Sequence, residues 1–177
     1  MRRYLACLMA LAVAILAVSS AFAGTLENKK NEWAFKFSYT DADSVGKETN
    51  LDLSWQYIIG KGYHEVGAVV NYFKDDPDVG ASLDATAIGP KYTWNWTPAN
   101  DKATGFVAGS YAVTGGDLGD SFDAIWEVNV GAKMFVGNSA AITADFFFSR
   151  AMGANGVPDQ DSKGIAVGIS IFTHGKK

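Results

Sequence analysis

The segment NEWAFKFSYT, residues 31–40, carries an aromatic side chain at every second position. Its aromatic residues are Trp33, Phe35, Phe37 and Tyr39, and Lys36 lies among the small residues between them. Side chains that alternate with a period of two belong to a β-strand, because successive residues of a strand point to opposite faces. The two faces of this strand therefore meet two different environments, one that accepts aromatic rings and one that accepts charged groups.

The same alternation recurs along the chain after residue 50. It predicts eight strands, near residues 31–40, 51–59, 65–72, 88–96, 103–113, 122–136, 142–149 and 164–171. In 103–113 the two faces are not distinguished by polarity. No helical period follows residue 24, so the predicted fold class is all-β.

The connections between these strands alternate in length. Short ones lie near 60–62, 97–102 and 137–139, and long polar ones at 41–49, 74–81, 114–121 and 151–162. Short turns on one side and long loops on the other are typical of an antiparallel up-and-down barrel in an outer membrane.

The first 23 residues have the features of an export signal. Arg2 and Arg3 form a basic start, residues 4–18 are apolar, and Ala21 and Ala23 supply small residues for cleavage. A twin-arginine signal and lipid attachment at Cys7 are the weaker alternatives, since Cys7 precedes most of the apolar run. The predicted organisation is a cleaved signal (1–23), a periplasmic extension (24–30), a barrel (31–172) and a periplasmic tail (173–177).

Charge and cysteine content exclude several classes of protein. Without the signal the chain has no cysteine, and therefore no disulfide and no thiolate nucleophile. It keeps 13 Lys and Arg residues against 19 Asp and Glu residues, which argues against nucleic acid as a partner. No apolar run after residue 23 is long enough for a membrane-spanning helix.

Alternation alone does not show which face points outward, since a soluble lipocalin-like barrel hides its apolar face inside. Here the polar face is rich in small residues with about one charge per strand, as in the crowded interior of a narrow barrel. The aromatic residues also gather near strand ends, as in the two girdles of a membrane barrel. Trp33, Tyr57, Tyr63, Trp94 and Trp96 lie toward the short turns, and Tyr39, Tyr72 and Phe122 toward the long loops. We therefore expect the aromatic face to meet lipid.

In this pattern of strands, turns and girdles, residues 31–172 resemble the small eight-stranded outer-membrane proteins, the group of the OmpA membrane domain, OmpX and OmpW. The resemblance implies an outer-membrane location in a Gram-negative-type envelope, with lipid and the outer-membrane assembly machinery as partners. The chain departs from the group at its C-terminus, where such barrels usually end on an aromatic residue. Here Thr-His-Gly-Lys-Lys follows Phe172. Phe172 also does not fall on the alternate positions from Ile165 to Ile171 that are expected to face lipid.

Seven charged residues lie at the alternate strand positions that are expected to face the barrel interior. They are Lys36, Asp52, Glu65, Lys91, Glu127, Lys133 and Asp145. Unpaired buried charges are costly, so we expect these side chains to pair with one another and fill the interior. The alternative is a continuous ion path through the barrel.

Gly89 and Pro90 lie inside the fourth predicted strand. A proline cannot donate a ladder hydrogen bond, so the pair predicts either a tolerated bulge or a weakened lateral seam. The resemblance to OmpW-like and acyltransferase barrels supports the second interpretation, in which an apolar solute passes sideways.

Catalysis is not expected. The lipid A enzymes among these barrels use histidine at the outer leaflet, whereas His64 and His174 are both predicted at the periplasmic side. A general base must reach its proton within about 3 Å. We expect no cofactor and no resident metal.

Three cations near the long loops occupy alternate strand positions that are expected to face outward. They are Lys74, Arg150 and Lys163. They are candidates for contact with the phosphates of lipopolysaccharide, with ordinary rim snorkelling as the alternative. The long loops also hold acidic residues, Asp41, Asp43, Asp75, Asp76, Asp78, Asp117, Asp120, Asp159 and Asp161. Solvated acidic loops are favoured over bound divalent cations, because their spacing matches no EF-hand loop.

Together these features predict a non-enzymatic outer-membrane barrel with an envelope-structural or loop-mediated interaction role. The alternative function is a narrow channel or a lateral port for small apolar molecules. The sequence does not indicate an oligomeric state.

Overall fold

The computed structural model describes residues 25–42, 46–76, 83–100, 102–116 and 119–174, with the side chains of 39–49 and 75–85 outside the description. The strands are β1 (Lys29–Ala42), β2 (Gly46–Ile59), β3 (His64–Asp76), β4 (Leu83–Asn95), β5 (Ala103–Gly116), β6 (Phe122–Gly137), β7 (Ala140–Gly153) and β8 (Gln160–His174). A single 3-10 turn, η2 (Gly60–Gly62), joins β2 to β3. Within these ranges no helix is long and apolar enough to cross a membrane.

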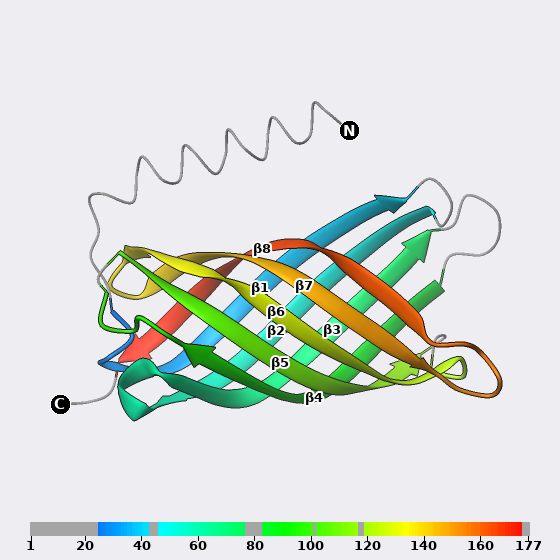
Figure 1. Ribbon diagram of the computed structural model, residues 1–177, viewed down its shortest axis with the longest axis horizontal. Coiled ribbons are helices and arrows are strands. Elements are labelled where there is room, and N and C mark those ends of the chain that lie inside the picture. Colours follow the sequence, from blue (N-terminus) through cyan, green and yellow to red (C-terminus); the bar gives the residue numbers. More distant parts are fainter. Residues whose placement is uncertain (1–24, 43–45, 77–82, 101, 117–118, 175–177) are drawn as a thin grey trace.

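The eight strands form one closed barrel in sequence order, each antiparallel to its neighbours. β1 pairs with β8, with Phe35 opposite Ile169, and this pairing closes the sheet. The short connections β2–β3, β4–β5 and β6–β7 lie at one end, together with the start of β1 and the end of β8 (Figure 1). The predicted all-β, eight-stranded up-and-down barrel is therefore confirmed.

The outer face of the barrel is apolar. In β1, Trp33, Phe35 and Phe37 are 44%, 46% and 53% exposed, whereas Lys36 and Ser38 between them are buried. The same arrangement holds on the other strands, where exposed large apolar residues include Leu53, Trp55, Val66, Ile88, Tyr92, Val113, Val130, Phe146 and Ile169. Soluble proteins rarely expose so large a continuous apolar surface to water, whereas a membrane barrel turns such a surface toward the hydrocarbon of the bilayer.

Some details of the strands differ from the sequence-based expectation. β1 starts two residues earlier than predicted, and β8 continues to His174. Phe122 was expected in an exterior girdle, but this placement is wrong, because the side chain is only 7% exposed. A β-bulge between Phe122 and Ala124 shifts the register against β7 and reverses the alternation at this end of β6.

An apolar cluster closes the interior at the short-turn end. This base cluster consists of Leu26, Ile58, Phe135, Ala141 and Phe172, all buried. The rings of Phe135 and Phe172 are 5.9 Å apart, and Phe172 is turned inward as its parity predicts. Leu26 precedes β1, and its N–H donates to the Pro98 carbonyl at 3.0 Å, in the β4–β5 connection. The segment before β1 thus crosses the barrel mouth toward the opposite wall.

Candidate functional site

The barrel interior brings together charged and polar side chains from most of the strands. Of the seven predicted interior residues, Lys36, Glu65, Lys91, Lys133 and Asp145 are buried, and Asp52 and Glu127 are half-buried. We call these seven residues, together with Glu32, the interior network.

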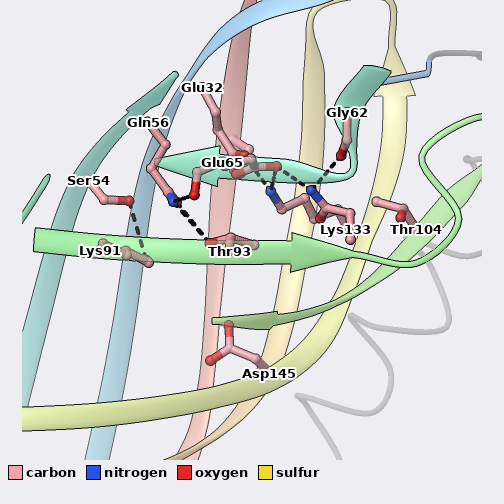
Figure 2. A network of polar contacts seen from close by, with 12 residues as sticks. Glu32, Ser54, Gln56, Gly62, Glu65, Lys91, Thr93, Thr104, Lys133 and Asp145 are labelled. Atoms are coloured by element: carbon pink, nitrogen blue, oxygen red, sulfur yellow. Dashed lines mark hydrogen bonds and ion pairs between the residues drawn. The ribbon is translucent and has the colours of Figure 1, made fainter. Parts of the chain in front are cut away.

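Directly above the base cluster, Lys133 of β6 links two carboxyl groups (Figure 2). Its Nζ lies 2.6 Å from Glu65 Oε1 of β3 and also forms an ion pair with Glu32 Oε2 of β1. Asn95 donates to Glu65 Oε1 at 2.7 Å, and Ser170 donates to Glu32 Oε1 at 2.5 Å. These contacts lie at one level along the barrel axis, and they join β1, β3, β4, β6 and β8 across the interior.

A second ion pair lies next to this level. Lys36 Nζ of β1 is 2.6 Å from Asp145 Oδ2 of β7, and Asn129 donates to Asp145 Oδ1 at 3.0 Å. Two ammonium groups lie near the Phe106 ring of β5, with Lys36 Nζ 5.2 Å and Lys133 Nζ 5.5 Å from the ring centroid. These distances fit cation–π contacts, so an apolar ring and two buried cations share the centre of the barrel.

A glycine makes room for the Lys36–Asp145 pair. Gly168 of β8 lies between the two strands, opposite Lys36 on one side and Thr143 on the other. A Cβ at this position would lie 2.8 Å from the Lys36 Cγ and 2.2 Å from the Phe35 carbonyl oxygen. Only glycine lets the lysine lie across β8 and reach β7.

The remaining predicted charges are not brought into ion pairs with one another among the described residues. Lys91 Nζ donates to Ser54 Oγ at 3.4 Å, a long contact. Asp52 accepts a hydrogen bond from Asn71, and Glu127 Oε1 accepts one from Asn129 at 2.9 Å. Part of the predicted network is thus satisfied by neutral partners.

Glu32 was missed by the sequence analysis, although it contributes to the most buried level of the network. The alternation gave the signal for it, since Glu32 precedes Ala34 and Lys36 with the same parity. It was overlooked because it lies next to the predicted start of the strand. With Glu32 included, the interior network holds five carboxyl groups and three lysines.

One small cavity can be described between these side chains. A cavity of about 10 Å³ lies among Lys36, Lys91, Lys133, Phe106 and Thr143. This volume is about that of one water molecule. At the level of the Lys133 pairs and the base cluster, the described side chains fill the barrel.

The structure keeps Gly89 and Pro90 in register within β4. The pairs on either side of them, Ile88 with Val113 and Lys91 with Ser110, show no shift, but residues 89 and 90 have no ladder partner on β5. Their pairing with β3 is continuous. A Cβ on Gly89 would lie 1.8 Å from the Tyr111 carbonyl oxygen, so the β4 and β5 backbones approach closely where the ladder is interrupted.

The three rim cations do not form one cluster. Lys74 lies on β3 and Lys163 on β8, with β2 and β1 between them. Arg150 of β7 makes a two-point ion pair with Asp161 of β8, at 2.5 and 2.9 Å. Through these hydrogen bonds the Arg150 guanidinium lowers the pKa of the Asp161 carboxyl. Arg150 is thus already partnered, with two of its five N–H donors in use.

Both histidines lie at the short-turn end. His64 Nδ1 is 2.7 Å from the Tyr92 hydroxyl, and His174 Nε2 is 2.7 Å from Lys29 Nζ.

Of the nine loop aspartates, Asp43, Asp78 and Asp117 lie outside the described residues, as do the side chains of Asp41, Asp75 and Asp76. Among the residues that can be described, no three His, Cys, Asp or Glu side chains come together to hold a metal ion.

A closed eight-stranded barrel with an apolar exterior and a polar, filled interior is the architecture of small transmembrane β-barrels. Solved structures show the same fold. Neisserial surface protein A (NspA) matches with a TM-score of 0.59 at 14% identity, covering 81% of this chain and 95% of that one. A de novo designed transmembrane β-barrel matches with a TM-score of 0.53 at 10% identity, over 84% of this chain and 99% of the design.

The N-terminal barrel domain of Pseudomonas aeruginosa OprF is a further match, with a TM-score of 0.47 at 9% identity over 84% of this chain and 99% of that domain. No protein-family model matches the sequence, and no curated protein matches it. The predicted resemblance to small outer-membrane barrels is confirmed at the level of the fold.

Proposed function

We propose that this protein is a non-enzymatic outer-membrane barrel that stabilises the envelope or presents its long loops to partners. The observation that carries the proposal is that side chains fill the barrel at the base cluster and at the Lys133 ion pairs. The Lys133 ion pairs and the base cluster occupy successive levels, and the cavity beside them holds about one water molecule. Such an interior suits a rigid scaffold better than a passage for solutes.

Electrical recording in planar bilayers tests this proposal. The purified protein is expected to give no stable large conductance steps, since ions would have to displace buried ion pairs. A variant with three shortened side chains, Lys133→Ala with Phe106→Ala and Phe135→Ala, supplies the positive control, provided that it still folds. Stable large steps from the unmodified protein would contradict the proposal.

The positions of the histidines support a non-enzymatic role. His64 and His174 lie at the end of the barrel opposite Arg150 and Asp161. By the expected orientation this end is periplasmic, a membrane thickness from lipid A in the outer leaflet. Lipid A acyl chains from cells with and without the protein are therefore expected to be identical, and a difference that His64→Ala abolishes would contradict this.

A lateral port is the second candidate, favoured by the two missing β4–β5 pairs at Gly89 and Pro90. If an apolar solute leaves the barrel there, Pro90→Ala should restore a ladder hydrogen bond and reduce uptake. Pro158→Ala, in the β7–β8 connection, is the matched control. Unchanged uptake in Pro90→Ala would count against the port.

For the partners, the proposal is contact with outer-membrane lipid through the apolar exterior and with lipopolysaccharide through Lys74, Arg150 and Lys163. Arg150 is held rigid by Asp161 and has donors left for a phosphate group. Lys163→Ala and Arg150→Ala are expected to reduce the amount of lipopolysaccharide that copurifies, whereas Lys61→Ala at the opposite end should not. The assembly machinery is proposed as a transient partner during insertion.

A further inference from the structure

The level of the network above the base cluster holds more negative than positive charge. Lys133 is the ammonium group that contacts both Glu32 and Glu65, at Oε2 of the first and Oε1 of the second. All three side chains are buried, and Glu65 is 0% exposed. If both carboxyl groups were ionised, two buried carboxylates would share one ammonium group, which is unfavourable.

The oxygen atoms of the two carboxyl groups are used differently. Both oxygens of Glu32 are engaged, one by Lys133 and the other by Ser170. Glu65 receives Lys133 and Asn95 on the same oxygen, Oε1, and its Oε2 is buried without a donor among the described residues. The two carboxyl groups contact the same Lys133 ammonium group, so they lie close together in the interior, and a proton on one of them would remove the repulsion between two negative charges.

Among the described residues, no ammonium group other than that of Lys133 forms an ion pair with Glu32 or Glu65. The other charged residues near this level are Lys36, which is paired with Asp145, and Lys91, which contacts Ser54 and lines the same small cavity as Glu32. The neutral polar groups around it are Gln56 of β2, Asn95 of β4, Thr104 of β5, Thr143 of β7 and Ser170 of β8. The base cluster below is entirely apolar.

We infer that the barrel interior contains a proton-binding site in which Glu65 carries a proton on Oε2, beside the ionised Glu32 and the ammonium group of Lys133. The level then holds one ammonium, one carboxylate and one neutral carboxylic acid, and its charges balance. Because the folded protein keeps a proton that the unfolded chain releases, its stability falls as the pH rises above the ordinary range of glutamate. Loss of the proton leaves an uncompensated charge next to the base cluster, which closes the barrel interior at the short-turn end.

Infrared spectroscopy of the purified full chain in detergent micelles tests this inference directly. A protonated carboxyl group absorbs at a C=O frequency distinct from that of a carboxylate, and the wild type is expected to show this band at neutral pH. Glu65→Gln should remove the contribution of the neutral acid at this position to the band, because an amide replaces it. Asp145→Asn, a buried carboxylate in a one-to-one pair, is the matched control and should retain it.

Thermal unfolding supplies the second readout. Glu65→Gln should keep the melting temperature of the wild type at neutral pH, whereas Asp145→Asn should lower it. Above the ordinary pKa range of glutamate, the melting temperature of the wild type should fall more steeply with pH than that of Glu65→Gln. If Glu65→Gln fails to fold, Glu32→Gln serves instead, since one carboxylate then matches one ammonium and the same contribution to the band should again vanish. The inference is overturned if the wild type shows no protonated band at neutral pH, or if Glu65→Gln loses as much stability as Asp145→Asn.

Discussion

Lys36 and Asp145 meet inside the barrel from strands that are not neighbours, with 2.6 Å between Nζ and Oδ2. β8 lies between their strands, and Gly168 provides the space over which the lysine passes. The pair therefore connects β1 to β7 across the seam where β1 and β8 close the barrel. A contact of this kind holds the closed form independently of the ladder hydrogen bonds.

Breaking this pair should be strongly destabilising. Asp145→Asn leaves the Lys36 ammonium buried without a carboxylate, and removal of one partner of a buried pair typically costs about 3–5 kcal/mol. The free energy of unfolding, measured by denaturant titration in detergent or lipid vesicles, checks this. The double variant Lys36→Met with Asp145→Leu removes both charges and should recover most of the loss. Equal destabilisation of the single and double variants would contradict the role of charge pairing.

The close approach of β4 and β5 leads to a second prediction. Gly89→Val should severely destabilise the barrel, because even a Cβ would lie 1.8 Å from the Tyr111 carbonyl oxygen. Gly109→Ala on β5 is the matched control, since the nearest atom to its Cβ would be 4.0 Å away. Heat-dependent mobility of the folded barrel on gels distinguishes the two variants. A well-folded Gly89→Val protein would show that the strands can separate at this point.

Much of the fold could be predicted from the sequence because lipid and lumen impose a strict period of two. The aromatic face of Trp33 to Phe37 and the inward position of Lys133 both follow from parity alone. Parity also predicted that Phe172 leaves the lipid face. It fails where a bulge inserts one residue, as at Phe122, because the alternation of a sequence does not show the bulge.

The partners within the site could not be predicted in the same way. Parity places Lys36 and Asp145 inside, but their contact depends on the stagger of the strands around the closed barrel and on space at Gly168. The base cluster depends on Leu26, which precedes the first strand and follows no strand period. These relationships are set by the three-dimensional closure of the sheet.

The segment before β1 provides a third prediction. Leu26→Ala removes a fully buried side chain from the base cluster and should lower the free energy of unfolding by about 2–5 kcal/mol. Glu27→Ala is the matched control, because this exposed neighbour should change stability by less than about 0.5 kcal/mol. Both values come from denaturant titration. If Leu26→Ala matches Glu27→Ala, the segment is not an integral part of the barrel base.

The exterior provides the last prediction, since it depends on which solvent the apolar face meets. Phe146 lies in the middle of β7 and is 69% exposed. In water, Phe146→Arg would be harmless or favourable, because an exposed aromatic ring is replaced by a soluble side chain. In a membrane barrel, an arginine near the bilayer midplane should cost about 2–4 kcal/mol. Phe146→Leu keeps the side chain apolar and should stay close to the wild type. Unfolding in lipid vesicles measures both variants, and a Phe146→Arg protein as stable there as the wild type would show that this face does not lie in hydrocarbon.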